Sequence, residues 1–319
     1  MLADLAAASG TFGRADALGG SGSAAAPPSP RRGAQSDGRG SAGRETVIET
    51  LAARGLVEAR GITPAGLDAL EPYRVRRAII LAAGRGERMR PATESLPKPM
   101  VRVNGVPIVS YALDALRAAG ISDVHVVRGY RAEKLDPLRG AYPEIDFIDN
   151  PLYDRTNNIT SLMAARHLLA GAYVMDSDLI LHRPQLISPY QYRSNYLGIP
   201  LDRARGWCFE TDSDGRITDA GPNVARGVHQ IVGISYWTPE DGARLAEDIP
   251  RALAQPGGPQ RYWDTVAIAT FPERYALHVR PCSADDVVEL DTYEELCAVD
   301  ASYRCARHAD RTEKRCCLA

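Results

Sequence analysis

The chain has 319 residues, of which 45% are hydrophobic and 24% are charged, as expected for a globular protein with a sizeable core. Its 38 basic and 40 acidic residues give a formal net charge of -2, which argues against nucleic-acid binding through a global positive charge. No run of about twenty apolar residues occurs, so we expect no membrane span. The N-terminus lacks a basic leader, so we expect no secretory signal. Six cysteines without a Cys-x-x-Cys pair indicate free thiols in a reducing cytoplasm.

The composition of the first 75 residues changes once, between residues 43 and 44. Residues 1–43 consist mostly of Ala, Gly, Ser, Pro and Arg, and such a segment buries too little surface to fold, so we expect a disordered tail. Residues 44–75 have a helical period, then a short extended segment, a turn and a second helix that begins at Thr63-Pro64. This order resembles the last part of a winged helix-turn-helix domain. The first helices of such a domain would fall in low-complexity sequence, so we interpret 44–75 as a partial remnant without DNA binding.

From residue 76 to residue 303 the sequence alternates between strand and helix patterns. Continuous apolar runs indicate buried parallel strands, and amphipathic segments of ten to fifteen residues indicate helices between them. This alternation predicts an α/β fold with a doubly wound, mostly parallel sheet, followed by a C-terminal tail over 304–319. The expected strands are 77–84, 123–130, 142–150 and 171–181, and the expected helices are 106–120 and 160–170.

The first predicted strand runs into a glycine-rich turn, and ligands on such sheets bind where the strands end. Gly84 and Gly86 let backbone N–H groups approach a phosphate closely. Arg88 follows directly, and Lys98 lies between two prolines ten residues later. Arg can clamp phosphate oxygens and Lys adds a point charge, so the turn suits a triphosphate better than a dinucleotide cofactor.

The segment 81–107 resembles the signature of the sugar-nucleotidyltransferase superfamily, in which Leu, two Gly, Arg, Pro, Thr, Pro-Lys and Gly-x-Pro recur at fixed spacing. The resemblance implies a Rossmann-like nucleotidyltransferase fold. It also implies that Arg88 and Lys98 are catalytic, because they neutralise the triphosphate and the departing pyrophosphate. The residues implied to hold the nucleotide in this turn are Leu81, Ala82, Ala83, Gly84 and Gly86.

Two pairs of acidic residues follow apolar runs far apart in the sequence. Asp176 and Asp178 lie in the fourth predicted strand, and Glu289 and Asp291 follow a short run near the C-terminus. Carboxylates from two strand ends can hold one Mg²⁺, which prefers oxygen ligands, although either pair alone could simply be solvated. The resemblance implies that Asp178 and Asp291 bind the metal. The resemblance also implies that Asp176 contacts the nucleotide and that Glu289 lies beside the metal or faces the substrate.

The string Asn157-Asn158-Ile159-Thr160-Ser161-Leu162 narrows the choice of nucleotide. It resembles the CTP:phosphocholine cytidylyltransferase group and its relatives that act on phosphonates such as 2-aminoethylphosphonate. Asn and Ser offer donors and acceptors to a pyrimidine edge, so Asn157, Asn158 and Ser161 are expected to bind the nucleotide. Sugar-phosphate enzymes usually have a Gly-Thr-Ala loop here.

Aromatic residues and one acid are candidates for the acceptor site, because aromatic faces can surround a quaternary ammonium and a carboxylate can balance its charge. The same aromatic residues could instead fill the core, and the sequence does not decide between the two roles. The candidates are Trp207, Tyr236, Trp237, Tyr262, Trp263 and Asp264.

The sequence therefore predicts a cytoplasmic Mg²⁺-dependent cytidylyltransferase. An acceptor phosphate or phosphonate oxygen attacks the α-phosphorus of CTP and pyrophosphate leaves, so no general base is needed. The partners are CTP and a small acceptor, either phosphocholine or a 2-aminoethylphosphonate-like compound, and a homo-oligomer is compatible with this prediction. Two alternatives stay open, a sugar-1-phosphate or polyol-phosphate nucleotidyltransferase and a nucleotide-sensing DNA-binding regulator.

Overall fold

The computed structural model of the protein describes residues 39–59, 61–204 and 206–304. Two compact units divide between Arg74 and Val75. The predicted tails lie almost entirely outside the described residues, but helix α2 begins at Arg39, before the boundary predicted at residue 43. None of the described helices has the length and apolar character needed to span a membrane.

The sequence predicts a helix, a short extended segment, a turn and a second helix here, and the described part of the first unit has a helix, an antiparallel hairpin and a second helix. Helix α2 (Arg39–Ala53) is followed by the antiparallel strands β1 (Val57–Glu58) and β2 (Gly61–Ile62) and by helix α3 (Pro64–Leu70). The Thr63 hydroxyl accepts a hydrogen bond from the backbone N–H of Gly66 at 3.1 Å, which caps α3 at the position expected for an N-cap.

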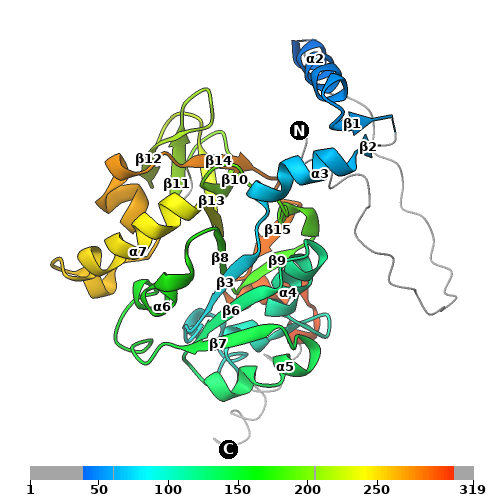
Figure 1. The fold of residues 1–319 in the computed structure, drawn as a ribbon. Helices are drawn as coiled ribbons and strands as arrows, with labels where there is room; N and C mark the ends of the chain where they lie inside the picture. The colour runs from blue at the N-terminus through cyan, green and yellow to red at the C-terminus, as the bar shows by residue number, and fades with distance from the viewer. Residues whose placement is uncertain (1–38, 60, 205, 305–319) are drawn as a thin grey trace, which may run out of the picture. The chain divides into compact units, whose positions relative to one another are not determined.

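A nine-stranded sheet forms the centre of the second unit, in the order β12-β11-β13-β8-β3-β6-β7, with β10 pairing with β13 and β14 (Figure 1). Strands β8, β3, β6 and β7 are mutually parallel, and β13 is antiparallel to β8. The strands are β3 Arg77–Ala82, β6 Asp123–Arg128, β7 Ile145–Asp149, β8 Ala172–Asp176, β10 Asn195–Pro200, β11 Cys208–Thr211, β12 Ile217–Gly221, β13 His229–Trp237 and β14 His278–Pro281.

Helices cover both faces of this sheet, as a doubly wound fold requires. Successive side chains of a strand point to opposite faces, so Ala78 and Ile80 of β3 join a core that includes residues of α4, whereas Ile79 and Leu81 join a core that includes residues of α6 and α7. The predicted α/β fold class is thereby confirmed. The helices are α4 Ile108–Ala118, α5 Leu138–Ala141, α6 Ile159–Ala165, α7 Pro239–Leu253 and α8 Tyr293–Val299.

The fourth predicted strand is in fact two strands. The sequence predicted one strand over 171–181, but β8 ends at Asp176 and β9 (Leu179–Leu181) belongs to a separate two-stranded sheet with β15 (Val287–Glu289). The pair is antiparallel and places Leu179 opposite Glu289. The backbone N–H of Leu290 donates to the carbonyl of Asp178 at 3.0 Å. This break brings the two acidic segments together, although more than a hundred residues separate them. A further hairpin is formed by β4 (Arg102–Val103) and β5 (Val106–Pro107).

Candidate active site

The glycine-rich turn after β3 packs directly against Lys98. Gly86 has a φ of 60°, in the left-handed region that favours glycine. A Cβ atom at Gly86 would lie 2.9 Å from the Cβ of Lys98, so a larger residue could not keep this approach. The Thr93 hydroxyl donates to the Gly86 carbonyl at 2.8 Å. The signature segment therefore folds back and returns Lys98 to the strand end.

A cavity of about 420 Å³ opens at the carboxyl end of β3. Arg88 and Lys98 contribute to its wall. Asn157 does not line it, because the Asn157 amide donates to the Gln260 carbonyl at 3.3 Å and its Oδ1 accepts from the backbone N–H of Asn158. The other residues predicted to bind the nucleotide all line this cavity: Leu81, Ala82, Ala83, Gly84, Gly86, Asn158, Ser161 and Asp176.

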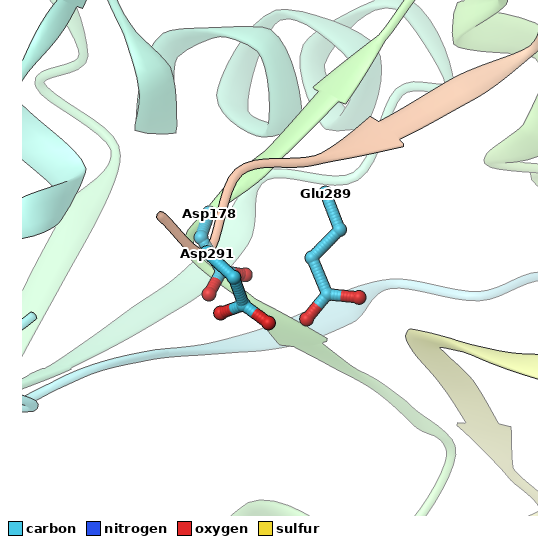
Figure 2. Close-up of side chains that lie close together, drawn as sticks. All are labelled: Asp178, Glu289 and Asp291. Atoms are coloured by element: carbon cyan, nitrogen blue, oxygen red, sulfur yellow. The ribbon is translucent and has the colours of Figure 1, made fainter. Parts of the chain in front are cut away.

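Three carboxylates converge at the junction of β9 and β15. Figure 2 shows Asp178, Glu289 and Asp291 with their carboxylates turned toward one another, and one oxygen of each lies within 4.8 Å of the others. Oδ1 of Asp178 is buried and has no hydrogen-bond partner among the residues that the structure describes. Three oxygen ligands in this arrangement could hold a hard divalent cation. The structure thus places Glu289 beside Asp178 and Asp291, the two residues predicted as metal ligands from the sequence.

Two basic side chains reach the same carboxylates. The Nζ atom of Lys98 lies 2.6 Å from Oδ2 of Asp178 and 3.0 Å from Oδ1 of Asp291. Burial acts to lower the pKa of Lys98, but the two neighbouring carboxylates outweigh it and raise that pKa above its ordinary value. Arg88, which is largely exposed, donates through Nη2 to Oδ1 of Asp291 at 2.8 Å. Both predicted catalytic cations therefore lie at the carboxylate cluster.

Asp176 lies deeper, where β8 meets β13. A Cβ at Gly233 would lie 2.2 Å from Oδ2 of Asp176, so glycine is required for the carboxylate to fit against β13. Burial raises the pKa of Asp176 well above its ordinary value, and repulsion from Asp178, Asp264 and Glu289 adds to the shift. Several carboxylates therefore lie close together at this end of β8.

A second cavity, of about 530 Å³, adjoins the first. Of the predicted acceptor residues, Trp207, Tyr262, Trp263 and Asp264 line it. Trp207 and Tyr262 are 48% and 57% exposed, so each offers ring surface to a ligand. Burial raises the pKa of Asp264 to about 7. The wall therefore combines aromatic surface with a carboxylate.

Tyr236 and Trp237 line neither cavity. Each is almost fully buried, and because both faces of β13 are covered, the two side chains enter opposite cores. The Tyr236 ring packs edge-on against Tyr173 at 5.6 Å between centroids, and the Trp237 indole N–H donates to the Ser235 hydroxyl at 3.0 Å. Of the two roles left open by the sequence, the structure places these two residues in the core.

Tyr196 is a cavity residue that the sequence did not single out. It lies in β10, its ring stacks on Trp263, and its buried hydroxyl has no hydrogen-bond partner among the described residues. Burial raises the pKa of Tyr196 well above its ordinary value, and the charges of Asp264 and Asp176 add to this shift. No motif marked Tyr196, because a tyrosine in an apolar strand is indistinguishable from a core residue.

The two cavities meet at the carboxylates. The residues that line both are Arg88, Asn158, Asp176, Asp178 and Asp291. One chamber has a glycine-rich turn and basic side chains, the other has aromatic rings and an acid, and the possible metal ligands lie between them. A doubly wound sheet with this site is the architecture of a nucleotidyltransferase, in which a nucleotide and an acceptor approach one reaction centre.

Comparison with known proteins agrees with this class. The model of the MobA-like NTP transferase domain matches residues 78–190. The 2-aminoethylphosphonate cytidylyltransferase of Lancefieldella rimae is 34% identical over 229 residues, which cover 71% of this chain and 92% of that protein. The choline-phosphate cytidylyltransferase of Streptococcus pneumoniae is 29% identical over 220 residues, which cover 69% of this chain and 94% of that protein.

A solved structure of a cytidylyltransferase is also similar to this chain. The CTP:phosphocholine cytidylyltransferase from Streptococcus pneumoniae superposes with a TM-score of 0.64 at 28% identity, covering 70% of this chain and 98% of that one. The chain therefore belongs to the MobA-like NTP transferase family of nucleotidyltransferases.

Proposed function

We propose that this chain is a cytidylyltransferase that couples CTP to a small phosphate or phosphonate and releases pyrophosphate. The observation that carries the proposal is the meeting of two chemically different cavities at the Asp178, Glu289 and Asp291 carboxylates. The relatives that act on 2-aminoethylphosphonate and choline phosphate support the same acceptor classes.

The carboxylate cluster suits Mg²⁺. All three groups offer oxygen, which Mg²⁺ prefers, and the buried Oδ1 of Asp178 has no other partner in the described part of the chain. Asp178, Glu289 and Asp291 would hold the ion. When bound, it would supply positive charge to the phosphate oxygens of the nucleotide.

Lys98 and Arg88 supply the remaining positive charge. In the structure both bind carboxylates of the cluster, so each cation lies where a triphosphate would meet the metal ligands. An acceptor oxyanion forms a bond to the α-phosphorus of CTP, and the bond from that phosphorus to the β-phosphate oxygen breaks. The oxyanion is already nucleophilic, so the two cations contribute by orienting and stabilising charge on the transferring group and on pyrophosphate.

The second cavity suits an acceptor with a positively charged end. Trp207 and Tyr262 present exposed rings, which attract an ammonium group, and the Asp264 carboxylate can balance its charge. The buried hydroxyl of Tyr196 lines the same cavity. Phosphocholine and 2-aminoethylphosphonate both combine such an end with the required oxyanion.

A panel of nucleotides and acceptors tests the proposal. Pyrophosphate release is measured with Mg²⁺, each of the four common ribonucleoside triphosphates, and phosphocholine, 2-aminoethylphosphonate or glucose 1-phosphate as acceptor. We expect release with CTP and an ammonium-bearing acceptor. Release with glucose 1-phosphate alone, or with none of the combinations, would refute the assignment.

A further inference from the structure

The end of β7 carries a buried amide that does not line either cavity. Asn150 is 3% exposed, and its Oδ1 accepts a hydrogen bond from the backbone N–H of Leu152 at 3.0 Å. This contact fixes which end of the amide carries the oxygen. Its Nδ2 then donates to the hydroxyl of Thr160 at 3.1 Å and to the hydroxyl of Ser161 at 3.0 Å.

The Asn150 amide sets the polarity of Ser161. A hydroxyl has one proton to donate and lone pairs that accept. Oγ of Ser161 accepts from Asn150 through one lone pair and donates to no acceptor among the described residues, so its proton is available to a ligand. Ser161 lines the nucleotide cavity, so it presents a hydrogen-bond donor there.

A backbone N–H group likewise fixes which end of the Asn158 amide is available to a ligand. Its Oδ1 accepts from the backbone N–H of Trp263 at 2.9 Å, so the side-chain nitrogen is the group available to a ligand. Asn158 also lines the cavity, and it lies three residues before Ser161, on the same face of the first turn of α6. Two neighbouring side chains therefore present two donors.

These donors differ in kind from the charged side chains of the cavity wall. The charged side chains Arg88, Lys98 and Asp178 suit phosphates and metal, whereas an uncharged donor can discriminate between bases. Cytosine has two adjacent acceptors, O2 and N3. Uracil keeps O2 but carries a proton on N3, which would place a donor against a donor.

We propose that Asn158 and Ser161 read the cytosine edge as a pair of fixed donors, and that Asn150 is the positioning residue that fixes the polarity of Ser161. The inference rests on the proposed function, because it assumes that CTP is the nucleotide. It adds a specificity mechanism and a residue, Asn150, that no motif indicates.

The first test compares the binding of CTP and UTP by calorimetry, which requires no acceptor and no turnover. The Asn158→Asp variant replaces the donor by an acceptor, so we expect the ratio of CTP to UTP affinity to fall by roughly 10- to 100-fold. Asn157→Asp is the matched control, since it places the same charge on a neighbouring residue that does not line the cavity. An equal change of the ratio in both variants, or a wild-type ratio near one, would overturn the proposal.

The second test isolates Asn150. In the Asn150→Asp variant the carboxylate accepts from Ser161, so the hydroxyl would turn a lone pair to the cavity. We expect CTP affinity to fall by the same factor as in Ser161→Ala, roughly 10-fold, with no further loss in the double variant. Full CTP affinity in Ser161→Ala at an unchanged melting temperature would contradict the proposal, even where the Asn150 variant fails to fold.

The two proposals fail separately. A wild-type chain that prefers CTP in binding but releases no pyrophosphate with any acceptor refutes the transferase reaction and leaves the base-reading pair standing. A wild-type chain that reacts equally well with CTP and UTP refutes only the base-reading pair.

Discussion

The Nζ atom of Lys98 lies 2.6 Å from Oδ2 of Asp178, and this contact joins the signature segment to the break between β8 and β9. Lys98 is held there by the glycine-rich turn, and Asp178 is held by the pairing of β9 with β15. The contact therefore links the predicted triphosphate-binding cation to the predicted metal ligands. In the proposed reaction a metal ion and phosphate oxygens would compete for these same groups.

Removal of either partner of this contact should stop the reaction without unfolding the chain. We expect Lys98→Ala and Asp178→Ala each to lower kcat for pyrophosphate release by roughly 100- to 1,000-fold, because Lys98 would stabilise the negative charge of the transferring group and Asp178 would hold the metal ion that does the same. Circular dichroism should be unchanged. The control is Lys134→Ala, since Lys134 is exposed and lines neither cavity. Wild-type kcat in either site variant would exclude the assigned roles.

Removal of a metal ligand should raise the metal requirement. Glu289→Gln keeps the shape of the side chain but removes one charge from the cluster, so we expect roughly 10-fold more Mg²⁺ for half-maximal activity. Chelation with EDTA should abolish turnover of the wild type, and added Mg²⁺ should restore it. Glu133→Gln is the control, because Glu133 is exposed and lines neither cavity. A Mg²⁺ titration that is as unaltered in Glu289→Gln as in this control would place Glu289 outside the metal site.

Asp264 should act on the acceptor and leave CTP unaffected. We expect Asp264→Asn to raise KM for an ammonium-bearing acceptor by roughly 10-fold, because a charge-assisted contact is lost, while KM for CTP stays the same. Trp207→Ala should raise the acceptor KM by a smaller factor, since cation–π attraction at an exposed ring is weak. A rise in KM for CTP as large as the rise in KM for the acceptor would contradict a role of Asp264 in binding the acceptor alone.

Asp264 should also make stability depend on pH. Its pKa is raised from 3.8 to about 7, so the folded chain holds a proton that the unfolded chain has released between these values. Stability contributed by that proton is present below pH 4 and is lost as the pH rises toward about 7. We therefore expect Asp264→Asn to melt a few degrees above the wild type at pH 8, without ligands, and the difference to shrink toward pH 4. A constant difference across that range would contradict the raised pKa.

The sequence predicted the fold class and most of the nucleotide cavity because both depend on local signals. A continuous apolar run locates β3, and the glycine-rich turn with Arg88 and Lys98 follows β3 directly. A short chemical motif at the end of a recognisable strand can be placed without knowing long-range contacts.

Other features depend on pairing between distant segments. Apolar residues lie on both sides of Asp176, Ser177 and Asp178, so 171–181 was predicted as one strand, and only the pairing of β9 with β15 brings Glu289 to Asp178. Tyr236 and Trp237 alternate along β13, but a central strand is buried on both faces, so period two could not assign either to a cavity. Asn150 acts through Ser161 and leaves no motif of its own.

The most direct test of the proposed reaction is the identity of its product. Phosphorus NMR of CTP, 2-aminoethylphosphonate or phosphocholine, Mg²⁺ and the wild-type chain should show pyrophosphate and a cytidylyl anhydride of the acceptor in equal amounts. The Asp178→Ala variant should leave the spectrum of the substrates unchanged. Free CMP without a coupled product, or unreacted CTP with both acceptors, would contradict the proposed transfer.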